Sequence, residues 1–326
     1  MKVWCFFNRA DLDGHCSAAI VRRWCGLNGH EFIPRGVDYG ESADWMEGAG
    51  PDSMAVIVDF TPEGDGAGLM LEAMGDAYGR GLVWVDHHKT ALERRIGDIG
   101  ILGLRKVGAA ACELTWRTLF PAADMPPAVR LLGRYDVFDR SDPKEWEKAI
   151  LPFQYGLRMR ETLPDSHAEE KKLWKTLLCP DKDWFIPQLI HEGMLLLRSE
   201  RKGNEIAALA GAYDCVFEGL PCCAMNGSGN SLRLDAYARP EHRMRIMWAF
   251  TGGRWKVSLF ENGDPAVDCG AVAARHGGGG HRGAAGFFLP ADLSPLVFFA
   301  PESGENAERR TPNAKRPTGN PEGGGE

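Results

Sequence analysis

The sequence predicts an α/β protein in which an N-terminal domain with a parallel sheet is followed by a helical connector and a smaller C-terminal α+β domain. In the first half of the chain, short apolar runs alternate with longer segments that carry apolar residues at helical spacing. This alternation is typical of parallel strands joined by crossover helices. Beyond residue 212 the apolar runs stay short and are separated by Gly, Asn and Pro, as in a sheet of short strands.

The elements predicted for the first domain are strands and helices in alternation. Strands are predicted over residues 3–7, 54–58 and 82–85, each an unbroken apolar run. Helices are predicted over residues 14–27, 67–78, 109–120 and 127–133, with a chain reversal at 135–139. Residues 143–210 have a mostly helical pattern that ends in the long connector.

In the second domain, strands are predicted over residues 213–217, 222–225, 244–250 and 255–260, and the pair Gly252-Gly253 indicates a tight hairpin. The predicted limits are 1–182 for the first domain, 183–211 for the connector and 212–298 for the second domain. Residues 299–326 have almost no apolar side chains, so they cannot offset the entropy of ordering and are predicted to form a disordered tail.

Composition excludes several classes of function. The 326 residues are 44% hydrophobic and carry a net charge of −7, which is typical of a globular protein without the positive field that would recruit duplex DNA. The nine cysteines include no C-x-x-C pair, so neither a zinc ribbon nor a thioredoxin-type site is indicated. No apolar stretch approaches the ~18 residues of a membrane span and the N-terminus lacks the features of a signal peptide, so we expect a cytoplasmic protein without a membrane partner.

Acidic residues follow the predicted strands of the first domain. Asp11 and Asp13 come after the run 3–7, and Asp59 comes directly after the run 54–58. Because the carboxyl ends of parallel strands gather at one edge of the sheet, these carboxylates are expected to converge there, where they would repel one another unless a cation binds them. Each residue taken alone is equally consistent with a helix N-cap or a turn.

The triplet Asp86-His87-His88, which ends the run 82–85, favours the metal interpretation. Adjacent histidines after a buried strand point in different directions, so one can ligate a metal while the other faces the bound ligand. Asp86 is expected to hold the ligating imidazole in the correct tautomer. Asp136 can supply the last carboxylate, although Asp139 lies close by in the sequence.

A run of four glycines, residues 277–280, lies between basic side chains in the second domain. Without Cβ atoms, the backbone N–H groups of such a run can approach an anion and form a phosphate nest. A flexible linker is the alternative, but such linkers are Gly/Ser tracts, and this run leads into the apolar residues 284–288. The predicted substrate-binding residues here are Arg275, Gly278, Gly279, Gly280, His281 and Arg282.

In these motifs and their order, the chain resembles the DHH phosphoesterase superfamily, and its second half resembles the DHH-associated domain. The matching residues are Asp11-Leu12-Asp13-Gly14, Asp59, Asp86-His87-His88, Asp136, Gly278-Gly279-Gly280-His281 and Ala284-Ala285-Gly286. The chain looks most similar to the nanoRNase and RecJ-like branch. The resemblance implies a Rossmann-like first domain and a hydrolase of short oligonucleotides, dinucleotides or single strands, exonucleases included. Some relatives carry the description exopolyphosphatase-related.

The resemblance also implies a cofactor and roles for the site residues. Two Mn²⁺ ions per chain are expected, with Mg²⁺ as the alternative. One ion is assigned to Asp11 and Asp59, and Asp59 is shared with the second. The residues assigned to that second ion are Asp13, Asp59, His87 and Asp136. His88 would face the scissile phosphate as the catalytic residue, while His281 and the glycine run would bind a terminal phosphate or nucleotide.

One departure from the family pattern concerns the first ion. Members usually carry a His or Asp ligand two or four residues before Asp11, and here those positions hold Arg9 and Phe7. Neither side chain can ligate a cation, and Asn8 between them offers only a carbonyl oxygen. We therefore expect a weaker first site, or a ligand from elsewhere in the chain, and a direct contact between Arg9 and phosphate.

The leading hypothesis is a metal-dependent phosphohydrolase that cleaves phosphodiester bonds of short oligonucleotides or dinucleotides with metal-activated water. Two alternatives stay open: an exopolyphosphatase-like hydrolase, and a catalytically impaired nucleotide-binding module, which the departure at residues 7 and 9 motivates. A processive single-strand exonuclease is less favoured, because such enzymes often append strand-binding domains and the predicted tail cannot fold into one. A homodimer contact through the helical segment 143–210 is a further hypothesis.

Overall fold

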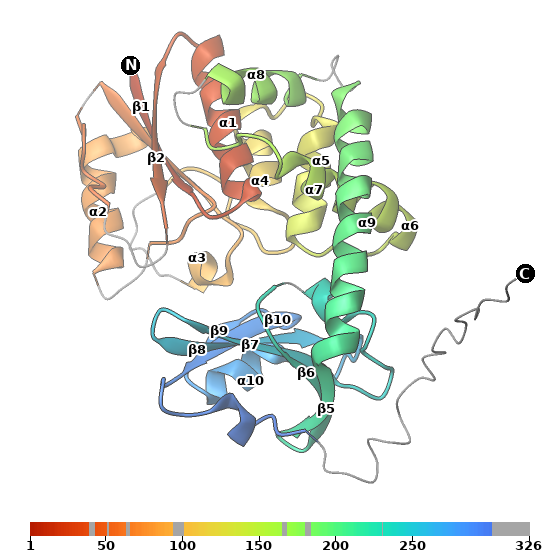
Figure 1. The fold of residues 1–326 in the computed structure, drawn as a ribbon. Coiled ribbons are helices and arrows are strands. Elements are labelled where there is room, and N and C mark those ends of the chain that lie inside the picture. Colours follow the sequence, from red (N-terminus) through yellow and green to blue (C-terminus); the bar gives the residue numbers. More distant parts are fainter. Residues whose placement is uncertain are drawn as a thin grey trace, which may run out of the picture. The chain divides into compact units, whose positions relative to one another are not determined.

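The computed structural model describes residues 1–38, 43–50, 52–62, 66–93, 101–164, 168–179, 184–229 and 231–301 (Figure 1). The chain divides into two compact units, Met1–Leu197 and Arg198–Glu326, and each contains its own sheet. The predicted domain limit at residue 182 and most of the predicted tail, residues 302–326, lie outside the described residues. Within the described part of the chain, no helix combines the length and apolar character needed to cross a bilayer.

The first unit is built on a parallel sheet of four strands, which confirms the predicted α/β class. The strand order is β2-β1-β3-β4, with β1 (Lys2–Asn8), β2 (Glu31–Val37), β3 (Ser53–Val58) and β4 (Leu82–Val85). All three pairings are parallel. Strand β2 was not predicted, because Pro34 and Arg35 interrupt its apolar pattern. Its place at the edge of the sheet explains why a proline, which cannot donate to the ladder, is tolerated there.

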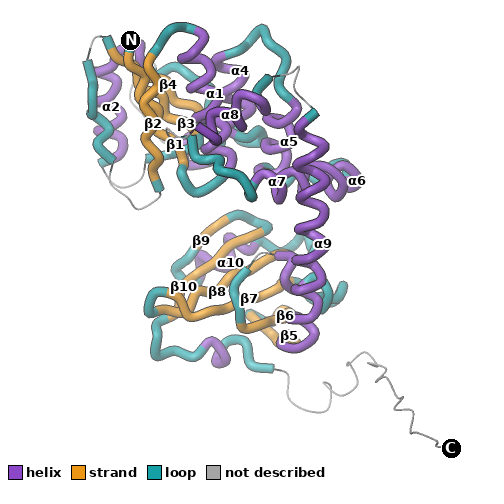
Figure 2. The backbone as a smooth tube through the Cα atoms, turned by 45° about the horizontal axis from the view of Figure 1, so that its top comes forward, coloured by secondary structure: helices purple, strands orange, loops and turns teal. Residues whose placement is uncertain are grey.

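Helices cover both faces of this sheet (Figure 2). Alternate residues of β1 belong to two different core clusters, one on each side of the sheet. Helix α1 (Leu12–Leu27) and helix α4 (Ala111–Leu119) pack on the face that carries Val3, Cys5 and Phe7. Helix α2 (Ala67–Tyr78) packs on the face that carries Trp4 and Phe6. Burial on both faces accounts for the unbroken apolar runs that predicted these strands.

The rest of the first unit is helical, in agreement with the helical pattern of residues 143–210 where the structure describes them. The helices are α3 (Lys89–Glu93), α5 (Pro127–Asp136), α6 (Pro143–Glu145), α7 (Leu151–Leu157), α8 (Ala168–Leu177) and α9 (Phe185–Gly211). A 3-10 turn spans Gly79–Gly81, and a π-helical turn spans Trp146–Ile150. Helix α9 continues across the division between the two units.

The second unit contains a six-stranded mixed sheet with the order β5-β6-β7-β8-β10-β9. The strands are β5 (Ala212–Phe217), β6 (Leu220–Asn226), β7 (Met244–Thr251), β8 (Arg254–Glu261), β9 (Gly279–Gly280) and β10 (Ala284–Leu289). Helix α10 (Cys269–Arg275) packs against this sheet, and 3-10 turns span Ser231–Leu234 and Pro295–Val297. Gly252 and Gly253 both have positive φ in the predicted hairpin between β7 and β8.

Candidate metal centre

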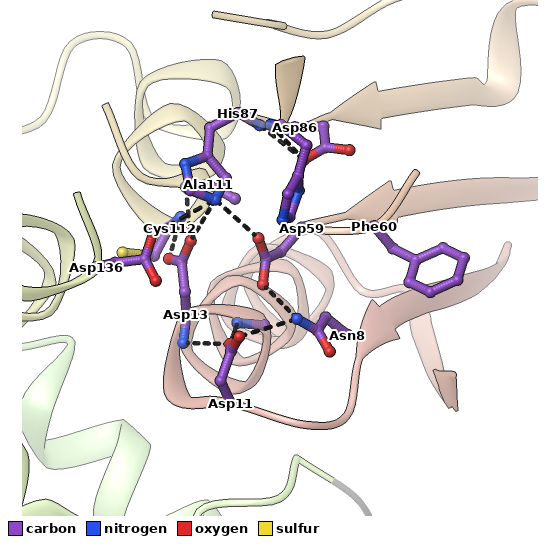
Figure 3. Close-up of polar contacts among 12 residues, drawn as sticks. Asn8, Asp11, Asp13, Asp59, Phe60, Asp86, His87, Ala111, Cys112 and Asp136 are labelled. Carbon is purple, nitrogen blue, oxygen red and sulfur yellow. Dashed lines mark hydrogen bonds and ion pairs between the residues drawn. The ribbon is translucent and has the colours of Figure 1, made fainter. Parts of the chain in front are cut away.

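The predicted acidic residues of the first unit meet at the carboxyl edge of its parallel sheet (Figure 3). Asp59 directly follows β3 and Asp86 directly follows β4, while Asp13 lies in the first turn of α1. Asp136 is the last residue of α5, and this helix end brings its carboxylate to the same place. The arrangement is the one that strand-end positions predict for a doubly wound sheet.

His87 lies at the centre of this cluster. Its Nε2 is 3.4 Å from Asp59 Oδ1, 3.4 Å from Asp136 Oδ2 and 3.9 Å from Asp13 Oδ2. Within the described residues, one group of potential metal ligands is Asp13, His87 and Asp136, and a second is Asp59, His87 and His88. The four residues predicted to share an ion, Asp13, Asp59, His87 and Asp136, are therefore brought together.

Asp13 is held in place by backbone groups of a distant helix. Its Oδ2 accepts a hydrogen bond from the Ala111 N–H at 2.8 Å, and its Oδ1 accepts one from the Cys112 N–H at 2.8 Å. These N–H groups open α4, where unpaired amide donors and the helix dipole favour a negative charge. Sequence reasoning did not find this contact, because backbone donors have no residue-type signature.

The charges in the cluster are unfavourable as the side chains stand. Burial raises the pKa of Asp59 well above its usual range, and the charges of Asp13, Asp11 and Asp136 raise it further. Burial and the charge of Asp13 also raise the pKa of Asp136 well above its usual range. Burial lowers the pKa of His87, although Asp13 acts against this, so the imidazole is the neutral ligand form near neutral pH. A bound cation would reverse these effects, because it favours ionised carboxylates and a neutral imidazole.

Two carboxylate oxygens of the cluster also lack a hydrogen-bond donor among the described residues. Among the described residues, Asp59 Oδ1 and Asp136 Oδ2 are buried without a hydrogen-bond donor. Asp59 is 1% exposed and has a φ of 53°, a left-handed conformation that non-glycine residues rarely adopt. Unpaired buried oxygens and backbone strain at one residue are features of a functional site. An oxygen-rich set with one imidazole fits Mn²⁺ or Mg²⁺, and these residues therefore fit the predicted cofactor.

Asp86 bonds the side chain of His88, the second histidine of the triplet. Its Oδ1 accepts a hydrogen bond from His88 Nδ1 at 2.7 Å, and not one from the imidazole of His87. The same oxygen accepts from the His87 N–H at 2.7 Å, and Oδ2 accepts from Thr61 Oγ1 at 2.5 Å. The role of Asp86 in holding the ligating imidazole stays a prediction.

Asp11 and Arg9, which were expected near the first ion, both have partners within the fold. Asp11 is the N-cap of α1, and its Oδ1 accepts from the N–H groups of Asp13 and Gly14. Arg9 forms a half-exposed ion pair with Asp38, with 2.7 Å between Nη2 and Oδ2. The predicted contact between Arg9 and phosphate stays a prediction.

The glycine run of the second unit has a structural explanation at three of its four positions, two of them through close packing. A Cβ at Gly278 would lie 2.1 Å from the carbonyl oxygen of Gly286, and a Cβ at Gly280 would lie 2.6 Å from Ala285 Cα. Strand β9 is formed by Gly279 and Gly280, and it packs closely against β10. A Cβ at Gly279, in contrast, would meet no heavy atom within 4 Å. A Cβ at Gly277 would meet no heavy atom either, but its φ of 76° favours glycine, so Gly279 is the residue of the run that neither close packing nor a positive φ explains.

The basic residues near this run also have partners within the second unit. Arg275 Nε donates to Glu218 Oε2 at 3.1 Å, and Arg282 Nε donates to the carbonyl oxygen of Val267 at 3.4 Å. His281 is exposed, and its backbone N–H donates to the carbonyl of Ala284. Anion binding by these residues stays a prediction.

No protein-family model matches the sequence, and no curated protein does. Among solved structures, an exopolyphosphatase-related protein from Bacteroides fragilis is 14% identical, with a TM-score of 0.48 and coverage of 91% of this chain and 89% of that one. A pGpG-specific phosphodiesterase from Vibrio cholerae is 13% identical, with a TM-score of 0.46 and coverage of 89% and 92%. RecJ from Thermus thermophilus in complex with Mn²⁺ is 17% identical, with a TM-score of 0.43 and coverage of 91% and 50%. These similarities are too low to argue an activity from, and the chemistry of the site has to be derived from its own side chains.

Proposed function

We propose that this chain is a divalent-cation-dependent phosphohydrolase that cleaves phosphodiester bonds of short oligonucleotides or dinucleotides. The observation that carries the proposal is the convergence of Asp13, Asp59 and Asp136 on His87, with buried carboxylate oxygens that lack donors among the described residues. The order of the motifs along the chain, which resembles that of DHH phosphoesterases, supports phosphoester chemistry at this site.

The cation would be held by Asp13, Asp59, His87 and Asp136. When bound, it supplies charge stabilisation at the phosphoryl oxygens and an activated water molecule for in-line attack. The chain itself fixes the geometry, because the amides of Ala111 and Cys112 orient Asp13 and the strained turn at the end of β3 orients Asp59. Carboxylates positioned in this way would lose little conformational entropy when the cation binds.

His88 is proposed to hold the proton that the leaving oxygen takes up. Burial lowers the pKa of His88, but the hydrogen bond from its Nδ1 to Asp86 and the charge of that carboxylate outweigh burial, so its pKa is raised. An imidazole with a raised pKa is more fully protonated near neutral pH and can act as a general acid. Asp86 is a positioning residue, which Thr61 in turn holds through its hydroxyl.

The proposal is tested with the full-length chain, in Mn²⁺ or in EDTA, on a 5′-phosphorylated dinucleotide, a short RNA and inorganic polyphosphate. We expect Mn²⁺-dependent release of mononucleotides, which Asp59→Asn abolishes and which the exposed-residue control Asp76→Asn leaves intact. Degradation of polyphosphate with every oligonucleotide intact would instead support an exopolyphosphatase-like activity. Nucleotide binding without turnover of any of the three substrates would support an impaired binding module.

A further inference from the structure

The side-chain amide of Asn8 donates hydrogen bonds to the carboxylates of Asp11 and Asp59, the two residues that were expected to bind the first cation. Its Nδ2 donates to Asp11 Oδ2 at 3.0 Å and to Asp59 Oδ2 at 3.2 Å (Figure 3). Asn8 is the last residue of β1 and is 4% exposed, and its hydrogen bond to Asp59 is buried, whereas the one to Asp11 is partly buried. Asn8 also lies between Arg9 and Phe7, the two positions where the family pattern lacks its ligand.

The orientation of this amide is fixed by a third contact. Asn8 Oδ1 accepts a hydrogen bond from the backbone N–H of Ala10 at 3.0 Å. A backbone N–H can only donate, so the opposite rotamer would set two donors against each other. The oxygen therefore faces Ala10, and the two N–H donors face the carboxylates.

Both oxygens of Asp11 accept hydrogen bonds from other groups of the chain. Oδ1 accepts from the two backbone N–H groups that open α1, and Oδ2 accepts from Asn8. Asp11 belongs to neither group of potential metal ligands among the described residues. The oxygens without donors, Asp59 Oδ1 and Asp136 Oδ2, are both on the side of His87.

We infer that the centre holds one divalent cation per chain, at Asp13, Asp59, His87 and Asp136, and that the Asn8 amide stands in place of a second. A cation between Asp11 and Asp59 would have to break two hydrogen bonds, of which the one to Asp59 is buried, and would face the positive end of the amide dipole. The amide satisfies the same oxygens without adding charge. This inference rests on the proposed function only in requiring that a divalent cation binds.

The test is the Mn²⁺ content per chain of the full-length protein, by elemental analysis after saturation and removal of excess ion. We expect one ion in the wild type and two in Asn8→Asp, which keeps the shape of the side chain but replaces the two donors with a ligand oxygen. Asn28→Asp, at an exposed asparagine, is the matched control and should keep one ion. Two ions in the wild type, or one in Asn8→Asp, would overturn the inference.

A second readout does not depend on a folded variant. The wild type with bound Mn²⁺ should give the electron paramagnetic resonance spectrum of an isolated ion, and a spectrum of two exchange-coupled ions would contradict the inference. Absence of any bound ion in the wild type would overturn the proposed function as well, so the two failures are distinguishable.

A separate observation concerns a stack of aromatic rings beside Asp136. Tyr135 lies against Trp146 with ring centroids 5.7 Å apart and planes at 5°, and Phe138 lies 6.2 Å from Tyr135 at 28°. Trp146 is buried, but Phe138 is 55% exposed. Phe138 also has a φ of 52°, because it is the left-handed residue that closes α5: its N–H donates to the carbonyl of Tyr135, and the N–H of Asp139 donates to the carbonyl of Arg134. Glycine is the usual residue at this position, so the phenyl ring is kept there at a conformational cost.

Guanidinium groups accompany this stack. Arg158 lies over the ring of Tyr135 at 5.6 Å, and Arg140 lies over the ring of Trp146 at 4.9 Å. Both arginines are exposed. An exposed ring with flanking cations, two residues after a metal-centre carboxylate, matches a nucleobase that carries a phosphate. A polyphosphate chain has no group that could stack there.

We propose that Phe138 stacks on a nucleobase of the substrate. This proposal rests on the proposed function and restricts the substrate of that function to nucleotides. In Phe138→Ala, KM for the dinucleotide should rise about 5- to 150-fold, the equivalent of about 1–3 kcal/mol of base stacking, with little change in kcat or Mn²⁺ content. Phe138→Trp should keep a near-normal KM, and Phe250→Ala, at another exposed ring, serves as the control. An unchanged KM in Phe138→Ala would overturn this proposal alone, whereas an inactive wild type would overturn the proposed function.

Discussion

Replacing Asp59 with Asn tests whether the cluster is built for a cation. Asn keeps the shape of the side chain and tolerates the left-handed backbone at this position. Burial and the charges of Asp13, Asp11 and Asp136 raise the pKa of Asp59 well above its usual range, so ionised Asp59 destabilises the metal-free fold. We therefore expect Asp59→Asn to unfold at a higher temperature than the wild type in EDTA.

The pH dependence of this difference follows from the direction of the pKa shift. Because the pKa of Asp59 is raised on folding, the folded metal-free wild type binds more protons than the unfolded chain above about pH 4, and its stability falls as pH rises. Below that pH both states are protonated and the two proteins should be equally stable. The advantage of Asp59→Asn should thus be absent near pH 4 and grow toward neutrality.

Added Mn²⁺ should reverse the order of the two proteins. An ion present at about 100 times its Kd stabilises the wild type by about 2.7 kcal/mol, which is roughly 5–11 °C in Tm for a unit the size of Met1–Leu197. Asp59→Asn should lose this rise, and the exposed-residue control Asp76→Asn should keep it. Differential scanning calorimetry in EDTA and in Mn²⁺ measures both effects. A Mn²⁺-dependent rise in Asp59→Asn as large as in the wild type would refute the assignment of Asp59 as a ligand.

Three further outcomes are expected. Asp86→Asn should lower kcat by about 10- to 100-fold and move the alkaline limb of the pH–rate profile to lower pH, because Asp86 raises the pKa of His88; an unchanged profile would exclude that pairing from the reaction. Gly278→Ala should destabilise the second unit by about 1–3 kcal/mol in chemical denaturation, whereas Gly279→Ala should be nearly neutral; equal effects would contradict the packing account. His281→Ala should raise KM about tenfold and leave Mn²⁺ binding intact, and a loss of bound metal would place this residue in the metal centre instead.

The strand-end part of the site could be predicted from the sequence because it depends on local pattern. A buried parallel strand is an unbroken apolar run, so the positions of Asp59 and Asp86 at strand ends follow from the residues that precede them. The missed elements are those without such a pattern. Strand β2 contains a proline, which interrupts its apolar run. Strand β9 consists of two glycines, and a glycine pair is equally typical of an anion-binding loop.

The rest of the site depends on tertiary contacts that local pattern does not encode. Sequence could not decide between Asp136 and Asp139. The structure places Asp136 3.4 Å from His87, and it pairs Asp139 with Arg134 at 2.8 Å. The role of Asn8 was equally hidden, because an asparagine between Phe7 and Arg9 indicates a ligand oxygen as readily as a hydrogen-bond donor. Only the N–H of Ala10 determines which end of the amide faces the carboxylates.

Three destabilising features coincide at the end of β3, and their coincidence is the strongest physical reason to regard the cluster as functional. Asp59 has a left-handed backbone, an oxygen without a donor among the described residues, and a charge buried near other carboxylates. Backbone strain and an unsatisfied buried oxygen each cost about 1–3 kcal/mol, a large share of the stability of a typical domain. If the residue in this turn had only a structural role, Gly or Asn could occupy the position. Either residue would remove the buried charge, and Gly would also remove the backbone strain. A cation bound between Asp59, Asp13 and Asp136 would offset the repulsion and engage the free oxygen, and it accounts for why a carboxylate stands at this position.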